Sequence, residues 1–202
     1  MHFEENFTYH VYNRSNQIVF KTTENYLYFL RKFREYIFNY VDVLAWCLMP
    51  NHFHFMLSPN KEATILVKEK HLPNTQLLSK QFGTLLSSYT KAFNKQNGRK
   101  GSLFAHNTNA KQLNQVAKHL QGAMQLSYAV TCFRYIHLNP VESNLVKTIK
   151  DWEFSSFKDF ANNRNGNLIN RDLAMRTVNY DSDNFERWSS IDMNDDDINN
   201  IF

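Results

Sequence analysis

The stretch Leu48-Met49-Pro50-Asn51-His52-Phe53-His54-Phe55-Met56-Leu57 joins a turn to a run in which histidine and apolar residues alternate. Read as a strand, it places His52 and His54 on one face, because strand side chains alternate. Phe53 and Phe55 then lie on the other face. Two imidazoles that project side by side from a rigid strand can supply two nitrogen ligands to one divalent metal ion. Two half-buried histidines that hydrogen-bond to their neighbours would show the same pattern, so the pair alone leaves both interpretations open.

The sequence around this stretch predicts a small sheet. Residues 7–13 are rich in aromatic and branched side chains and are typical of a first strand. Residues 41–48 are almost continuously apolar, which predicts a central strand covered on both faces. Pro50-Asn51 makes the turn, and the strand that carries the histidines returns antiparallel. The central unit is therefore a strand, a helix and a hairpin.

Four further segments have helical periodicity. A helix capped by Thr22 or Thr23 is expected to run to about Tyr40, and a second to cover residues 74–97. Residues 115–124 are expected to be helical, and a last helix covers residues 127–139, where Pro140 stops it. On this last helix Val130, Phe133 and Ile136 form the core face, whereas Tyr135 and Asn139 lie four residues apart on a different side.

Composition indicates one well-buried domain with an extension. The chain has 202 residues, of which 43% are hydrophobic and 15% aromatic. No apolar run approaches the about 20 residues of a membrane helix, and the N-terminus lacks a signal-peptide pattern. Cys47 and Cys132 stand in apolar contexts, which favours buried thiols and a cytoplasmic protein. We expect a domain over residues 1–160 and, over 161–202, a loosely packed acidic, Asn- and Asp-rich extension with a short helix near 171–178.

Charge is divided unevenly along the chain. Residues 1–150 carry 18 Lys+Arg against 8 Asp+Glu, a net of +10, whereas residues 151–202 carry 5 against 11, a net of −6. A basic body suits a polyanionic partner such as nucleic acid, although scattered lysines are also ordinary solvated surface. The candidates for contacts with a phosphate backbone are Arg14, Lys91, Arg99 and Lys100.

Four ordered blocks of sequence resemble a known family. They are His10–Arg14 (HVYNR), Ala45–His54 (AWCLMPNHFH), Tyr135–Val141 (YIHLNPV) and Asp151–Phe157 (DWEFSSF). Together they resemble the bacterial single-tyrosine transposases of the HUH type, named for a His-hydrophobe-His motif. The REP-associated or insertion-sequence-like branch is the nearest one. The resemblance covers roughly residues 7–160.

The resemblance implies an α+β fold, in which helices pack on a ferredoxin-like antiparallel sheet. It implies that His52, His54 and Asn139 bind a divalent metal, Mg²⁺ or Mn²⁺, and that Tyr135 is the nucleophile. Tyr135 would cleave and rejoin single-stranded DNA or DNA hairpin ends through a 5′-phosphotyrosine intermediate. A homodimer is implied as well.

Some positions depart from the family pattern. After Leu103-Phe104 the family often continues with Gln and then Arg before an aromatic residue, whereas this chain has residues 105–108 as Ala-His-Asn-Thr. Glu142 stands where a basic residue is usual. These departures bear on target specificity more than on catalysis.

Two other functions stay open on the sequence. A ferredoxin-like module could bind single-stranded nucleic acid without catalysis. A metallohydrolase could hold zinc on His52 and His54, but no carboxylate base is obvious near that motif.

Overall fold

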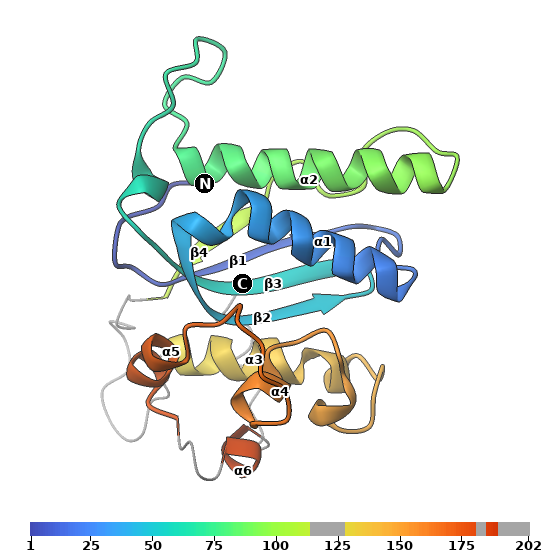
Figure 1. Ribbon diagram of the computed structural model, residues 1–202, viewed down its shortest axis with the longest axis vertical. Helices are drawn as coiled ribbons and strands as arrows, with labels where there is room; N and C mark the ends of the chain where they lie inside the picture. The colour runs from blue at the N-terminus through green and yellow to red at the C-terminus, as the bar shows by residue number, and fades with distance from the viewer. Residues whose placement is uncertain (114–127, 181–184, 190–202) are drawn as a thin grey trace.

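The computed structural model describes residues 1–113, 128–180 and 185–189, so the helix expected over residues 115–124 lies outside the described residues. The described part is α+β: a four-stranded antiparallel sheet with helices on both faces (Figure 1). The strand order is β2-β3-β1-β4, and every neighbouring pair is antiparallel. The predicted ferredoxin-like antiparallel sheet is confirmed. The strands are β1 (Tyr9–Arg14), β2 (Val41–Met49), β3 (His52–Pro59) and β4 (Asn109–Gln112).

Helices cover the sheet from two sides (Figure 1). One face carries α1 (Thr23–Tyr36) and α2 (Leu77–Gln96), and the other carries α3 (Tyr128–Glu142) with the short helices that follow it. None of the described helices is long and apolar enough to cross a membrane. The remaining elements are the 3₁₀ helices η1 (Phe38–Tyr40), η2 (Glu62–Thr64) and η3 (Ile149–Asp151), and the α-helices α4 (Phe157–Phe160), α5 (Arg171–Val178) and α6 (Phe185–Ser189).

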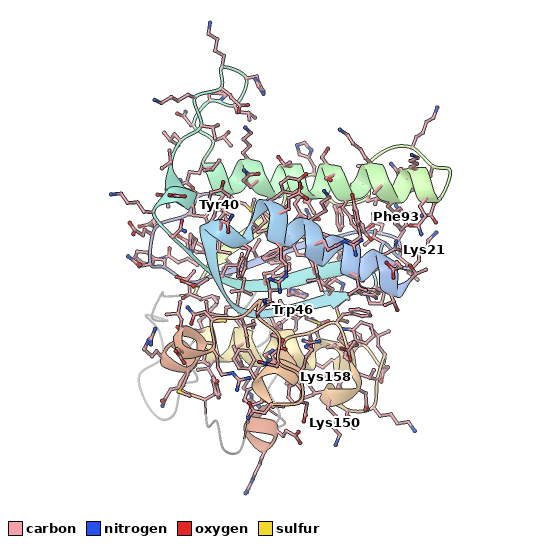
Figure 2. All side chains as sticks on the ribbon, in the orientation of Figure 1. Lys21, Tyr40, Trp46, Phe93, Lys150 and Lys158 are labelled. Carbon is pink, nitrogen blue, oxygen red and sulfur yellow. The ribbon has the colours of Figure 1, made fainter. Side chains whose placement is uncertain are left out.

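Strand alternation divides the core into two parts. Phe53 and Phe55 point toward α1 and α2, where the Phe55 ring stacks on Phe33 with 4.2 Å between centroids. At the end of α2, the Lys21 ammonium lies 5.3 Å from the centre of the Phe93 ring (Figure 2). The alternate residues His54 and Met56 point toward α3 and are buried there. The alternation read from the sequence therefore holds along β3.

Strand β2 is an edge strand rather than the central strand that its apolar run predicted. Its outer edge is covered by the chain that follows α3. The N–H of Leu48 donates to Phe154 O at 2.8 Å, that of Ser156 to Trp46 O at 2.9 Å, and that of Asn170 to Val43 O at 2.8 Å. Covering both faces and the free edge buries the strand as fully as a central one, so the sequence pattern is the same.

Helix α3 continues past Pro140, so the predicted stop at that residue was wrong. Pro140 lacks an N–H, but in the last turn only one backbone hydrogen bond is lost. The helix ends instead at Glu142, and Asn144 just beyond it adopts a left-handed conformation with φ 54°. The N–H of Asn144 donates to Val141 O, and that of Leu145 donates to Pro140 O, the pairing of a Schellman motif.

Residues 161–180 pack more tightly than the loose extension that their composition predicted. The expected helix at 171–178 is present as α5, and its Ala174 and Val178 are buried against β2 and α3. Arg164 also binds the buried Asp159 carboxylate with Nε to Oδ1 and Nη2 to Oδ2, both at 2.8 Å. The loop folds so closely over this carboxylate that a Cβ on Gly166 would clash with Asp159 Oδ1. Apolar anchors and one buried ion pair thus fix a segment that is polar on average.

Candidate active site

The centre of the candidate site is His54, which lies on β3 and is 2% exposed. Its Nδ1 is 2.8 Å from Nε2 of His10, a buried histidine on the neighbouring strand β1. Its Nε2 lies 3.4 Å from the Asn139 amide nitrogen on α3. Each ring nitrogen of His54 therefore contacts a neighbouring side chain, Nδ1 from the sheet and Nε2 from helix α3.

His52 lies two residues earlier on the same face of β3. The two imidazole rings are 4.9 Å apart between centroids and nearly perpendicular, at 88°. The Nδ1 of His52 lies 2.6 Å from Oδ1 of Asn51, and since that oxygen only accepts, Nδ1–H is the donor. This leaves the Nε2 lone pair of His52 for a ligand contact.

Helix α3 brings Tyr135 and Asn139 to the histidines. The Tyr135 ring packs edge-on against His54, with 5.4 Å between centroids and an angle of 88°. Asn139, one turn further along, faces His54 with its amide nitrogen 3.4 Å from His54 Nε2, and it lies close enough to His52 and Tyr135 to affect the pKa of each. The predicted phenol, amide and pair of imidazoles therefore meet in one place within a single chain, although His54 and Asn139 are 85 residues apart in the sequence.

Burial controls the charge states of these groups. It lowers the pKa of His52 to about 4, against an opposing hydrogen bond from Asn139 and with a smaller contribution from the Arg14 charge. Burial also lowers the pKa of His54 well below its usual range, reinforced by the positive charges that His10, His52 and Arg14 can carry. Both imidazoles are therefore neutral near pH 7, which is the form that binds a metal.

The pKa of Tyr135 moves in the opposite direction. Burial raises it above its usual range, and the nearby Glu142 carboxylate adds to that rise, while the hydrogen bond to Asn139 opposes it. The phenol is therefore protonated in the free protein, and it must lose its proton to act as a nucleophile.

The donor set fits a divalent metal ion. Nε2 of His54 faces the Asn139 amide, the lone pair of His52 Nε2 lies nearby, and a half-turn of the Asn139 side chain presents Oδ1 instead of Nδ2 at the same place. Two nitrogens and one amide oxygen occupy three positions, which leaves others for phosphate oxygens or water. Within the described ranges, no group of three or more His, Cys, Asp or Glu side chains forms an alternative metal site.

The four candidate phosphate-binding residues do not lie together. Arg14 ends β1, is exposed, and pairs in register with His52, so it lies beside the histidines. Lys91, Arg99 and Lys100 belong to α2 and the turn after it, on the opposite face of the sheet. The structure therefore associates only Arg14 with the candidate site.

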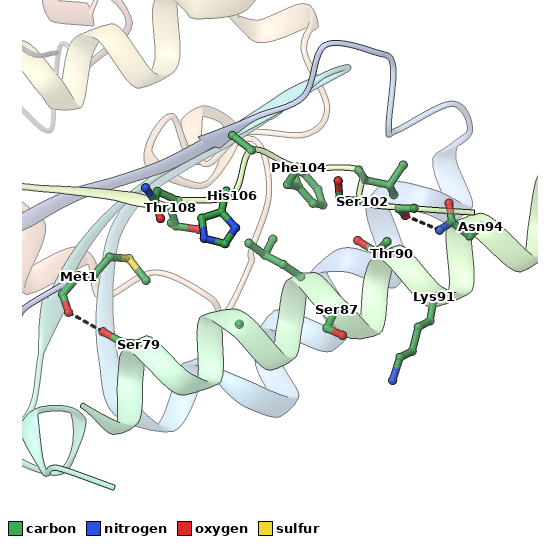
Figure 3. Close-up of a pocket in the computed structure, with 16 residues that line it drawn as sticks. Met1, Ser79, Ser87, Thr90, Lys91, Asn94, Ser102, Phe104, His106 and Thr108 are labelled. Carbon is green, nitrogen blue, oxygen red and sulfur yellow. Dashed lines mark hydrogen bonds between the residues drawn. The ribbon is translucent and has the colours of Figure 1, made fainter. Parts of the chain in front are cut away.

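A groove of about 640 Å³ runs between α2 and residues 101–108 (Figure 3). Its lining includes Ser79, Thr90, Asn94 and His106 and contains no acidic side chain. Lys91 belongs to the helical wall, but its ammonium group points away from Phe104 and His106 (Figure 3). The interior of the groove is thus polar but carries little charge.

Sequence reasoning gave no role to two side chains at the site. His10 hydrogen-bonds to His54, and the ring of Tyr12 lies 5.9 Å from that of His54 between centroids. Both belong to the first strand, whose alternation places His10 and Tyr12 on the same face. The signal that could have found them is the pairing of β1 with β3, which puts Tyr12 directly opposite His54.

Comparisons with known proteins agree with this architecture. No protein-family profile matches the sequence, and no curated protein matches it. Among solved structures, the chain is similar to a REP-associated tyrosine transposase bound to a REP hairpin, with 16% sequence identity and a TM-score of 0.52. The similarity covers 91% of this chain and 87% of the other. The resemblance read from the sequence is thus confirmed in three dimensions, and the chain has the fold of a REP-associated tyrosine transposase.

Proposed function

We propose that this chain is a metal-dependent transposase of the HUH single-tyrosine type, which cleaves and rejoins single-stranded DNA through Tyr135. The observation that supports this most directly is the contact of the Tyr135 ring with His54, with Asn139 beside both. A nucleophile and a metal-ligand set within one side-chain length of each other are what phosphoryl transfer requires.

In this proposal His52, His54 and Asn139 hold Mg²⁺ or Mn²⁺. The bound ion would polarise the scissile phosphate and stabilise the negative charge that develops on it. The three protein ligands are all neutral, so they leave the charge of the ion undiminished. Asn139 lies beside both Tyr135 and His54, so its side chain can orient both groups.

Tyr135 carries out the covalent step. Its phenolic oxygen attacks phosphorus, the bond from phosphorus to the 3′-oxygen breaks, and that oxygen leaves as a 3′-hydroxyl after taking up a proton. The tyrosine is then joined to the 5′-phosphate of the downstream strand. Because this ester retains the free energy of the original phosphodiester, a second 3′-hydroxyl can reverse the step and join new ends without ATP. The raised pKa of Tyr135 means that its proton must leave as the new bond forms.

The proposed substrate is single-stranded DNA or a DNA hairpin end. The solved structure with this fold is bound to a REP hairpin. In this chain Arg14 is the cation placed to contact a phosphate next to the histidines, since it is exposed and opposite His52. The expected homodimer stays a prediction. The site is complete in one chain, so we propose that Tyr135 serves its own His52 and His54.

Trapping the covalent intermediate tests the proposal. The full chain is incubated with Mn²⁺ and a pool of hairpin-bearing oligonucleotides that have randomised single-stranded flanks, labelled at either the 5′ or the 3′ end. A 5′-phosphotyrosine linkage gives an adduct that survives a denaturing gel and retains only the 3′ label. Tyr135→Phe should abolish this adduct, because it removes the attacking oxygen.

Tyr12→Phe is the matched control, because Tyr12 is a second phenol close to His54. It should leave adduct formation intact. An adduct that persists in Tyr135→Phe, or that disappears only in Tyr12→Phe, would contradict the assignment of Tyr135.

A second candidate is a nucleic-acid-binding module that does not cleave. The position of Glu142 favours it, because this carboxylate raises the pKa of Tyr135 at a place where the resembling family has a basic residue. Tight binding of the same oligonucleotides without any metal-dependent adduct would support this candidate. The zinc hydrolase alternative has no structural support, since the part of the chain that the structure describes contains no group of three or more His, Cys, Asp or Glu side chains arranged to hold a metal ion.

A further inference from the structure

His10 is a buried histidine that the proposed chemistry does not use. It is 0% exposed and lies on β1, on the face that points toward α3. Its register partner on β3 is Met56, so it reaches His54 diagonally across the two strands. The two rings are almost parallel, at 21°, with 5.1 Å between centroids and 2.8 Å between His10 Nε2 and His54 Nδ1.

The positions of the protons in this pair follow from the state of the second ring nitrogen of His54, Nε2. A hydrogen bond between two neutral imidazoles needs one N–H and one lone pair. If His54 binds a metal through Nε2, the nitrogen that faces Asn139, then its proton is on Nδ1. His54 Nδ1–H is then the donor, and His10 Nε2 is the acceptor. His10 must therefore carry its own proton on Nδ1.

We propose that His10 is a positioning residue: it holds His54 in the one tautomer and ring orientation whose Nε2 lone pair faces Asn139, and it thereby sets the affinity of the site for a divalent ion. This inference rests on the proposed metal-binding role of His54. Metal-binding histidines usually donate their second N–H to a fixed acceptor, and loss of that acceptor weakens metal binding.

The packing around His10 supports this role. Its ring contacts Tyr12, with 4.8 Å between centroids, and lies 6.5 Å from the ring of Tyr135. His10 is thus held behind both His54 and Tyr135 and has little freedom to turn. A carboxylate in the same place would be a stronger acceptor but would add a buried negative charge. The neutral imidazole orients His54 while the ligand set stays neutral.

Metal affinity is the first test, measured by Mn²⁺ titration of the DNA-free protein with the free ion followed by electron paramagnetic resonance. His10→Phe keeps a planar ring but removes the acceptor, and we expect Mn²⁺ to bind about 10- to 100-fold more weakly. His10→Gln can place an amide oxygen near the former Nε2, so it should restore most of the affinity. His137→Phe is the matched control: it removes a buried imidazole that hydrogen-bonds to Ser156, away from His54, and should leave the affinity unchanged.

The second test reads the tautomer of His54 directly in the metal-free protein, from the ¹⁵N shifts and ring correlations of labelled histidine. The wild type and His10→Gln should show the proton on Nδ1, whereas His10→Phe should show a mixture of both tautomers. A folded His10→Phe with wild-type Mn²⁺ affinity and an unchanged His54 tautomer would overturn the proposal. If that variant does not fold, a His10→Gln protein in which His54 carries its proton on Nε2 would also overturn it.

These measurements separate this inference from the proposed function. If no covalent adduct forms but the tautomer and the affinity both respond to His10→Phe, the transposase proposal fails and the positioning role stands. If Tyr135 forms the adduct but His10→Phe changes neither the His54 tautomer nor the Mn²⁺ affinity, only the positioning role fails.

Discussion

The two faces of the sheet bury different kinds of side chain. Toward α1 and α2 the core is mostly aromatic and apolar, as in the stacked pair Phe33 and Phe55, with a few buried amides such as that of Asn13. Toward α3 it also contains polar groups that are at most 4% exposed, among them His10, His54 and Asn139. Burying a polar group costs free energy unless it finds a partner, and these groups find one another. We therefore expect the face toward α1 and α2 to supply most of the stability, and the face toward α3 to supply less.

Adjacent residues on β3 offer the strongest test of this comparison, because Phe55 and His54 point to opposite faces. Phe55 is fully buried, and Phe55→Ala should lower the free energy of unfolding by about 3–5 kcal/mol. His54→Gln keeps an amide that can hydrogen-bond to its neighbours, so we expect less than half of that loss. The second variant should nevertheless lose Mn²⁺ binding. Urea unfolding and Mn²⁺ titration measure the two effects.

The opposite ranking would break the comparison. If His54→Gln destabilised the protein as much as Phe55→Ala, the buried polar groups on the α3 face would contribute as much to the free energy of unfolding as the aromatic core does. Phe33→Ala serves as the control for the apolar face, since it removes the other ring of the same stack. It should resemble Phe55→Ala in stability.

Acid should destabilise the α3 face selectively, because the buried histidines among residues 1–113 and 128–180 all lie on that face. Burial lowers the pKa of His137 to about 3 and that of His52 to about 4. A histidine in the unfolded chain takes up a proton near pH 6.5, so the unfolded state binds more protons between that pH and the lowered values. The stability from neutral burial is thus complete above about pH 6.5 and falls as the pH drops toward 3.

The test is the slope of unfolding free energy against pH between pH 4 and 6. His137→Gln can still hydrogen-bond to Ser156 but does not titrate, so it should reduce that slope by up to about 1.4 kcal/mol per pH unit. The exposed His2 gives the control variant His2→Gln, which should follow the wild type. A wild-type slope in His137→Gln would mean that His137 takes up its proton without unfolding.

Much of the site could be predicted from the sequence because the relevant physics is local. Alternation along one strand fixed the faces of His52, His54 and Phe55, and helical spacing put Tyr135 and Asn139 on one side of α3. A strand and a helix have periods that do not depend on what packs against them. The meeting of these two elements came from the family resemblance, not from periodicity.

The features that sequence reasoning missed depend on distant pairing. The hydrogen bond between His10 and His54 joins residues 44 positions apart, and it depends on the register in which β1 pairs with β3. The edge position of β2 was hidden because residues after α3 cover that edge. Average composition likewise underestimated the packing of residues 161–180, since a few anchors such as Val178 and the Asp159–Arg164 pair hold the segment.

The smallest expected effect concerns which face meets DNA. Arg14 lies beside His52, whereas Lys91 lies on the opposite face and points away from the groove there. Arg14→Gln should weaken binding of a hairpin-bearing oligonucleotide by about 1 kcal/mol and reduce the magnitude of the slope of log affinity against log salt by about 0.7, the value for one lost phosphate contact on a single strand. Lys91→Gln should change neither quantity by as much. Fluorescence anisotropy over a range of salt concentrations measures both. If Lys91→Gln produced the larger change, the DNA would run along α2. The main contacts with the DNA backbone would then lie on the opposite face of the sheet from His52 and His54.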